Sequence, residues 1–137
     1  MAFWILKSEP STYSFDDLVK DGKTVWDGVH NPQALMNIRS MLKGDLAFFY
    51  HSGEGKCIVG IAEIVSSPYP DPKQKDPKLA VVEIAPKKKV QHEITLSEIK
   101  ATKMFSELKL VRQPRLSVIP VPPEMWKALL RMCGERQ

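Results

Sequence analysis

The apolar residues of this chain gather in short runs that are separated by prolines, glycines and polar residues. Each run has the length of one strand, and aromatic and β-branched residues are common in the runs, as is typical of strands. The glycine-containing segment 52–56 predicts a hairpin loop, and the lysine-rich residues 87–90 either prolong a strand or bend away from it. The pattern predicts strands over residues 3–7, 45–51, 57–65, 79–84 and 116–121.

Capping residues and the helical spacing of apolar side chains predict four helices. A capping box, an asparagine followed by proline, a second capping box and a proline pair stand at the four starts. Asn37 is expected on the polar face of the second helix, whose buried face is predicted to carry Leu35, Ile38, Met41 and Leu42. The predicted helices cover residues 15–21, 32–43, 96–99 and 123–133.

The order of these elements predicts one α+β domain that spans residues 1–137. Helices do not alternate with all of the strands, so a doubly wound parallel sheet is not expected. We expect a mixed, curved sheet or a small open barrel with helices around it. The proline- and charge-rich segment 66–78 has the length of a functional or disordered loop, and residues 102–113 fit a helix or a loop.

Composition narrows the class of protein. Hydrophobic residues make up 43% of the chain and charged residues 26%, which is typical of a globular domain and excludes collagen, coiled-coil and disordered chains. No apolar run approaches the roughly 20 residues of a membrane-spanning helix, and the first residues lack the basic start of a signal peptide. We therefore expect a cytoplasmic protein without a membrane partner. The net charge of +4 is compatible with a polyanionic partner, although many basic proteins bind no nucleic acid.

Cysteine and histidine are too few and too scattered to indicate a metal site. Cys57 and Cys133 stand far apart, which favours two small buried residues over a redox pair. His30, His51 and His92 show no metal-binding spacing, and the chain has no glycine-rich phosphate loop. The sequence therefore calls for no metal ion and no cofactor.

Trp26 is the residue that most suggests a ligand site. It falls between two predicted helices, among residues typical of turns, and neither helical nor strand periodicity places it in the core. An indole in such a loop can offer a flat face to an unpaired or flipped base. The alternative is that Trp26 closes one end of the core. Trp4 and Trp126 follow strand and helix periodicity, and both are expected in the core.

Other polar residues stand where predicted strands end, and such positions often border a ligand crevice. Ser8 and Glu9 follow the first strand and can read the hydrogen-bonding edge of a base, or they can form only a local turn. Ser8 lacks the surrounding motif of a nucleophilic serine. His51 and Ser52 can line the same cleft or serve only their loop. Tyr69 can form a second aromatic wall, or it can fix its loop to the sheet.

Basic residues in three places are candidates for phosphate contacts. Arg115 precedes the last predicted strand, and lysines gather at residues 87–89 and in the loop over residues 73–78. Each group can equally form a solvated surface.

Six segments, in order over nearly the whole chain, carry a recognisable pattern. They read WILKSEP (4–10), WDGVHNPQA (26–34), GDLAFFYHS (44–52), VGIAEI (59–64), YPDP (69–72) and RLSV (115–118). Together they resemble the EVE domain family. The resemblance implies a PUA-like fold related to YTH and ASCH domains, with a curved mixed sheet or open β-barrel and peripheral helices.

The resemblance also implies a function, which is non-enzymatic binding of DNA or RNA through a methylated or hydroxymethylated base held in an aromatic pocket. It names neither the modification nor an oligomeric state. The candidate ligand-binding residues are Trp26 as a stacking wall, Ser8 and Glu9 at the pocket floor, Asn31 near the rim, and His51, Ser52, Tyr69 and Arg115.

Two other classes of function remain open. Some ASCH relatives are small amidohydrolases that act on modified nucleosides, and Lys7 and Glu9, with Thr24 or Ser8, offer a lysine and an acid for such chemistry. A protein-interaction module that uses the proline-rich loop is the third reading.

Overall fold

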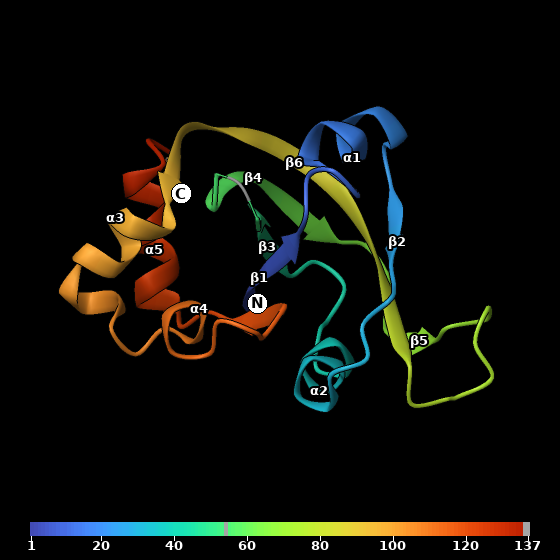
Figure 1. The fold of residues 1–137 in the computed structure, drawn as a ribbon. Helices are drawn as coiled ribbons and strands as arrows, with labels where there is room; N and C mark the ends of the chain where they lie inside the picture. Colours follow the sequence, from blue (N-terminus) through green and yellow to red (C-terminus); the bar gives the residue numbers. More distant parts are fainter. Residues whose placement is uncertain (54, 136–137) are drawn as a thin grey trace.

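The computed structural model describes residues 1–53 and 55–135 and shows a curled mixed sheet with helices around it (Figure 1). Its strands are β1 (Phe3–Ser8), β2 (Thr24–Trp26), β3 (Leu46–His51), β4 (Cys57–Ile64), β5 (Tyr69–Pro70), β6 (Ala80–Thr95) and β7 (Val118–Pro120). Six of them follow the order β2-β6-β4-β3-β1-β7, and β5 pairs with β6 beside this path. Over the described residues, β1 and β3 are parallel and the other pairs are antiparallel. The predicted α+β class with a mixed sheet is confirmed.

The helices begin where their caps predict them. Both predicted capping boxes form, since Ser14 accepts from the Asp17 N–H at 3.1 Å and Thr95 accepts from the Glu98 N–H at 3.2 Å. Among the helices of the described residues, none combines the length and the hydrophobicity of a membrane span. The helices are α1 (Phe15–Asp21), α2 (Pro32–Arg39), α3 (Leu96–Ala101), the 3-10 helix η1 (Lys103–Phe105), α4 (Lys109–Arg112) and α5 (Pro123–Met132).

The long strand β6 produces the curvature of the sheet. It has 16 residues, and it pairs with β2 and β5 near its start and with β4 along much of its length. The β4–β6 register shifts between Ile58 and Gly60 and again between Ile61 and Ala62, and such bulges bend a sheet. As a result β6 arches over the other strands in Figure 1. Residues 87–90 therefore prolong the strand, which was one of the two sequence-based alternatives.

The core has two sides because both faces of the central strands are covered. Phe48 and Phe49, neighbours in β3, point to opposite faces, and both are fully buried. Phe48 packs against Trp126 of α5, with 4.1 Å between ring centroids. On the other face, Phe49 meets Phe15 of α1 edge-on at 5.4 Å. Gly60 of β4 makes room for this ring, since a β-carbon there would lie 2.5 Å from a Phe15 carbon.

Two side chains near α2 differ from the sequence prediction. The helix ends at Arg39, well before Gly44, so Leu42 falls in a turn and is 67% exposed instead of buried. Asn37 is buried, and its amide donates to the Val118 carbonyl at 2.8 Å. The prediction missed this role because a buried backbone carbonyl that needs a donor leaves no trace in a helical periodicity. The predicted core positions of two tryptophans and both cysteines are confirmed for Trp4, Trp126, Cys57 and Cys133.

Candidate functional site

A cleft of about 500 Å³ opens at the C-terminal end of β1. β1 and β2 contribute to its walls, together with the turn after β1, the loop before α2 and the segment before β7. Its volume lies in the range of ligand-binding pockets. The cleft brings together three of the predicted site residues, Ser8, Glu9 and Trp26. Its lining consists of Lys7, Ser8, Glu9, Thr12, Tyr13, Thr24, Val25, Trp26, Asp27, Gly28, Val29, His30 and Ser117.

Trp26 lies deeper than its place in the sequence suggests. It is the last residue of β2 and not a loop residue, because β2 pairs with β6 and sets Trp26 opposite Val82. Strand alternation turns Val25 outward and Trp26 inward, where the indole packs edge-on against Phe49 at 5.6 Å. Trp26 is 8% exposed. It therefore closes one end of the core and lines the cleft at the same time, which joins the two sequence-based alternatives.

The indole N–H of Trp26 is open to solvent. Among the described residues, no hydrogen-bond acceptor engages it. Every fully buried side-chain nitrogen or oxygen atom of these residues has a hydrogen-bond partner. The nitrogen must therefore touch solvent, and Trp26 is one of the residues that line the cleft. It is a donor that a ligand can use.

Three polar residues at the end of β1 line the cleft. The half-buried Lys7 donates to the Pro114 carbonyl at 2.8 Å, and burial lowers its pKa. The Ser8 hydroxyl donates to the Tyr13 carbonyl, which fixes the turn that follows the strand. Glu9 is exposed, and within residues 1–53 and 55–135 no donor engages its carboxylate. Glu9 therefore offers a ligand an open acceptor.

His51 and Ser52 lie beside the cleft and do not line it. Nε2 of His51 accepts from the Phe15 N–H at 3.0 Å, so the ring is neutral and carries its proton on Nδ1. Burial also lowers the pKa of His51. The Ser52 N–H donates to the Ser8 carbonyl at 2.9 Å. Both residues thus hold the cleft's supporting strands and α1 in place.

Asn31 and Arg115 meet at a second hollow of about 360 Å³. The Asn31 side chain caps α2 by accepting from the Ala34 N–H at 3.0 Å, and the residue is exposed. His30, the preceding residue, lines the main cleft. The two hollows are therefore neighbours along this loop, and Asn31 and Arg115 lie near the rim of the cleft.

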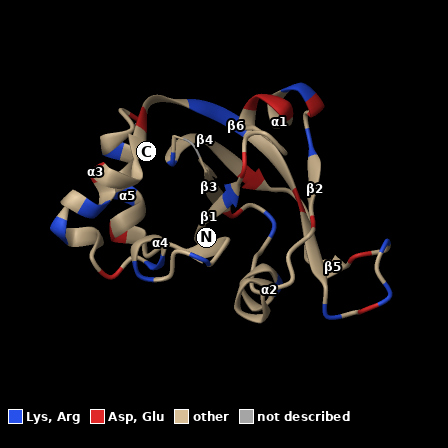
Figure 2. Ribbon diagram, in the orientation of Figure 1, with Lys and Arg blue, Asp and Glu red and all other residues tan. Residues whose placement is uncertain are grey.

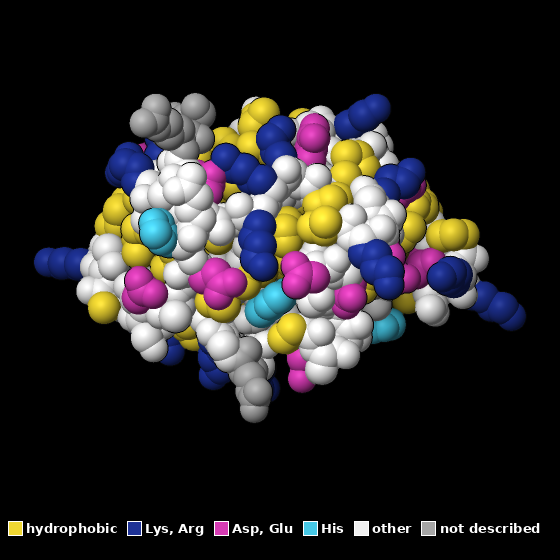
Figure 3. All heavy atoms as spheres, turned by 90° about the horizontal axis from the view of Figure 1, so that it is seen from above, with side chains coloured by type: hydrophobic (Ala, Val, Ile, Leu, Met, Phe, Trp, Pro, Cys, Tyr) yellow, Lys and Arg dark blue, Asp and Glu magenta, His cyan; other side chains and the backbone are white. Residues whose placement is uncertain are grey.

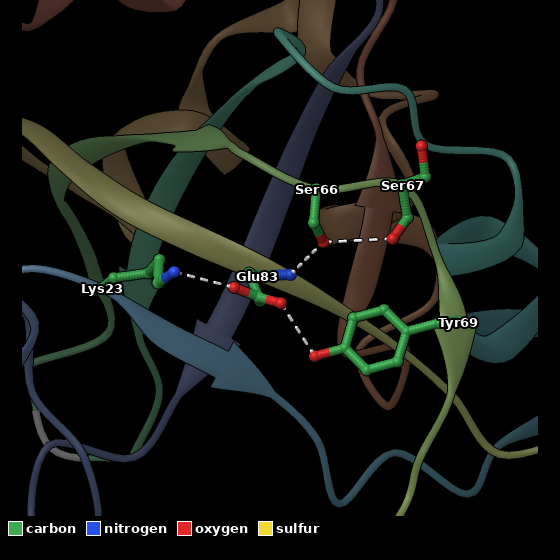
Figure 4. Close-up of polar contacts among 5 residues, drawn as sticks. All are labelled: Lys23, Ser66, Ser67, Tyr69 and Glu83. Atoms are coloured by element: carbon green, nitrogen blue, oxygen red, sulfur yellow. Dashed lines mark hydrogen bonds and ion pairs between the residues drawn. The ribbon is translucent and has the colours of Figure 1, made fainter.

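Tyr69 fixes its loop to the sheet and does not line the cleft. Its hydroxyl donates to the Glu83 carboxylate at 3.0 Å, and Lys23 pairs with the same carboxylate at 3.0 Å. Ser66 accepts from the Glu83 N–H at 2.9 Å. Figure 4 shows these contacts converging on Glu83 from three segments. Of the two sequence-based alternatives for Tyr69, the structure shows the anchoring one.

Lysine and arginine residues are spread over many separate segments of the ribbon (Figure 2). Residues 87–89 lie on the arch of β6, whereas the lysines of residues 73–78 lie on the loop beside β5. At about 3.3 Å per strand residue, the stretch from Ala80 to Lys88 separates the two groups by roughly 25 Å. They therefore do not form the single phosphate patch that the sequence allowed. On the face formed by α1 and β6, acidic and basic side chains are interspersed (Figure 3).

Several lining residues were not among the predicted site residues. Asp27 and His30 follow Trp26 in the sequence and share its motif, which was the available signal. From the sequence, Lys7 was considered for hydrolysis and not for reading a base. Ser117 joins the cleft because its carbonyl accepts from the Lys7 N–H at 3.0 Å, a contact between distant segments that no local pattern reveals. Over the described residues, no group of three side chains is arranged to hold a metal ion.

Known proteins share the sequence pattern of this chain over nearly its whole length. Residues 2–132 match the family model of the EVE domain. The chain belongs to the EVE domain family. The resemblance read from the six motifs is thereby confirmed.

Three similar proteins place this EVE domain among its relatives. Rpa0253 from Rhodopseudomonas palustris is 43% identical, and its solved structure has a TM-score of 0.93 with 98% of this chain and 94% of that chain covered. Thymocyte nuclear protein 1 from Gallus gallus is 32% identical over 97% of this chain and 69% of that protein. Human THYN1 protein, solved in complex with 5-methylcytosine-containing DNA, is 28% identical, with a TM-score of 0.90 and 100% of both chains covered.

The fold of this EVE domain is PUA-like. A YTH domain from Zygosaccharomyces rouxii superposes with a TM-score of 0.59 over 99% of this chain and 88% of that chain, at 15% identity. This likeness concerns the fold alone. Together with the curled mixed sheet, it confirms the architecture that the motifs implied.

Proposed function

We propose that this EVE domain binds nucleic acid and reads a modified base, methylated or hydroxymethylated, in the cleft between β1 and β2. The likeness to human THYN1 carries the proposal, because that protein shares the whole fold and was solved with 5-methylcytosine-containing DNA. The cleft is the proposed binding site, since it has the volume of a ligand pocket and is lined by hydrogen-bond donors and acceptors. The proposed role is binding without chemistry.

The cleft offers what the edge of a base requires. The Glu9 carboxylate accepts, and cytosine and adenine each present an exocyclic amino group that donates. The Trp26 N–H and the Lys7 ammonium donate, and ring nitrogens or carbonyl oxygens of the base accept. These groups stand on or directly after β1 and β2, which the core holds in place. A site on strands is preorganised for its ligand.

A methyl group by itself provides limited selectivity. Its burial contributes about 0.8 kcal/mol, which corresponds to roughly fourfold in affinity. Stacking of a base contributes about 1–3 kcal/mol, and only the lower part of this range is expected from an indole that is 8% exposed. A base in a duplex must also leave the stack, at a further cost. We therefore expect tighter binding to single strands, with an affinity that falls as salt rises.

Fluorescence anisotropy with labelled single strands of one sequence tests the proposal. The strands carry cytosine, 5-methylcytosine, 5-hydroxymethylcytosine, adenine or N6-methyladenine, in DNA and in RNA. At least one modified strand is expected to bind about fourfold or more tightly than its unmodified partner. Equal affinities within every modified and unmodified pair would refute base reading and leave only general nucleic-acid binding.

Matched pairs of variants test whether the preference for a modified strand arises in the cleft. Trp26→Phe and Trp126→Phe each remove one indole from the core, but Trp26 alone of the two lines the cleft. Glu9→Gln and Glu124→Gln each neutralise one exposed glutamate, and Glu9 is the one in the cleft. Trp26→Phe and Glu9→Gln are expected to reduce the preference for the modified strand, and the two partner variants are expected to retain it. Equal losses in both members of a pair would contradict the assignment.

One observation favours a second candidate function, hydrolysis of an acylated nucleoside. Burial lowers the pKa of Lys7, and a lysine with a lowered pKa can act as a base; Glu9 lies in the same cleft. Incubation with a panel of acylated nucleosides, read by mass spectrometry, tests this candidate. A product that disappears with Lys7→Met would support it, and the absence of product at high protein concentration would dismiss it.

A further inference from the structure

A separate hollow of about 320 Å³ lies on the other face of the sheet, at the N-terminal end of β1. Phe3 and Leu46, neighbours across the β1–β3 pair, contribute its strand side. Leu46 shares the sheet face of Phe48, which α5 covers, whereas the Trp26 cleft lies on the side of Phe49. The hollow and the Trp26 cleft are therefore two distinct sites.

The floor of this hollow is apolar and partly open to solvent. Phe3 stacks on Trp126 of α5, with 4.6 Å between centroids and 16° between planes. Phe3 and Leu46 are only partly buried, and Met1, Ile61 and Leu130 complete the apolar part of the lining. Apolar and aromatic walls with a few polar groups are typical of small-molecule sites.

Three exposed lysines border the apolar floor, namely Lys87 and Lys88 of β6 and Lys127 of α5. Lys88 pairs with the buried carboxylate of Glu135. Within the described chain, neither Lys87 nor Lys127 forms an ion pair, and Glu63, which faces Leu46 across the β3–β4 pair, does not line the hollow. Two unmatched positive charges therefore flank an apolar cavity, which complements a ligand that is apolar at one end and anionic at the other.

We propose that this hollow binds a small hydrophobic carboxylate, with its apolar body against Phe3 and Trp126 and its carboxylate at Lys87 and Lys127. The size of the hollow sets the size of the ligand. A volume of about 320 Å³ equals the share of roughly ten water molecules at ~30 Å³ each, so the body has about eight to ten non-hydrogen atoms. A second protein molecule needs a contact surface of about 800 Å², which this small cavity does not provide by itself.

Two-dimensional ¹H–¹⁵N NMR with octanoate as the probe tests the proposal. The chain has three tryptophans, so three indole signals are expected, and Trp26→Phe and Trp126→Phe assign two of them. Octanoate is expected to shift the Trp126 signal in a saturable way and to leave the Trp26 signal in place. Three control compounds are expected to bind more weakly than octanoate. Acetate lacks the apolar body, 1-octanol lacks the negative charge, and octylamine carries a positive charge instead. No saturable shift with octanoate at millimolar concentration, or an equal response to octylamine, would overturn the proposal.

Surface variants complete the test because they leave the core untouched. Lys87→Ala and Lys127→Ala are each expected to raise the dissociation constant of octanoate about two- to fivefold, and Lys103→Ala, an exposed lysine of η1, is expected to leave it unchanged. Equal effects of all three variants would overturn the placement of the carboxylate. Sedimentation of the wild type tests whether a second copy of the chain occupies the hollow. A dimer that Lys127→Glu dissociates would assign the hollow to a second copy of the chain instead.

Discussion

Replacing Asp45 by alanine removes one carboxylate that binds three donors from separate segments. Asp45 is 2% exposed and stands directly before β3. It accepts from the Ala2 N–H at 3.0 Å, the Leu42 N–H at 3.0 Å and the Trp4 indole N–H at 3.1 Å. These bonds tie the start of β1 to the turn after α2, and so they align the parallel β1–β3 pair whose far end carries the cleft.

The expected loss of stability follows from the three donors that Asp45→Ala leaves without an acceptor. A buried donor left without a partner costs about 1–3 kcal/mol. The Trp4 indole N–H is buried, whereas the N–H groups of Ala2 and Leu42 are only partly buried, so water can replace part of their bonds. We expect Asp45→Ala to lower the free energy of unfolding by about 3–4 kcal/mol. Asp45→Asn keeps one acceptor oxygen and is expected to lose about half as much.

The pH dependence adds a second check. Burial of Asp45 disfavours its charge, but the three donors outweigh burial and set its pKa below the ordinary value. Its carboxylate therefore stabilises the fold above the unfolded pKa of about 3.9, and this contribution is lost as the pH falls through the folded pKa. The stability difference between wild type and Asp45→Asn is expected to be full at pH 7 and to shrink below about pH 4.

Urea denaturation at several pH values measures both effects. Asp76→Ala serves as the control, because Asp76 is exposed and accepts one bond, from the Lys78 N–H at 2.9 Å. A loss for Asp45→Ala no larger than for Asp76→Ala would refute the reasoning. A difference between wild type and Asp45→Asn that grows as the pH falls would also refute it.

Three further predictions follow from other contacts. Gly60→Ala drives a methyl group into the Phe15 ring and is expected to lower the free energy of unfolding by about 1–3 kcal/mol. In urea denaturation, the double variant with Phe15→Leu should recover part of this stability, and additive losses would contradict the clash. Burial lowers the pKa of His51, so its neutral ring stabilises the fold above the ordinary value near 6.5 and this contribution is lost as the pH falls; NMR titration of the ring should give a midpoint below 6.5, and a higher one would contradict it. Glu135→Gln weakens the ion pair between the buried carboxylate of Glu135, which follows α5, and the exposed Lys88; the variant is expected to lose about 1–2 kcal/mol in urea, and no loss would contradict this.

Local signals explain why much of the fold was predictable. Capping residues act through neighbours three positions away, so the starts of α1 and α3 follow from Ser14 and Thr95 alone. Strand length and composition identify β1, β3 and β4. By contrast, β2 has three residues and exists because it pairs with β6, which follows much later in the chain. Trp26 was therefore placed in a loop, since the partner that makes it a strand residue is not local.

The candidate site was predictable to the extent that its residues are close in sequence. Ser8 and Glu9 mark the end of a strand, and Trp26 marks the start of a polar loop, so each could be found separately. Their meeting in one cleft depends on β1 and β2 being held by the same curled sheet. Tyr69 was a candidate second wall because it stands in the long proline-rich loop, but its bond to Glu83 keeps it on the loop beside β6.

The signal of the Trp26 indole N–H during titration with a modified single strand tests the central claim most directly. If the base enters the cleft, this signal shifts with the same midpoint as the binding measured by anisotropy, while the Trp126 signal stays fixed. A strand that binds while the Trp26 signal does not move would place the modified base elsewhere and contradict the account.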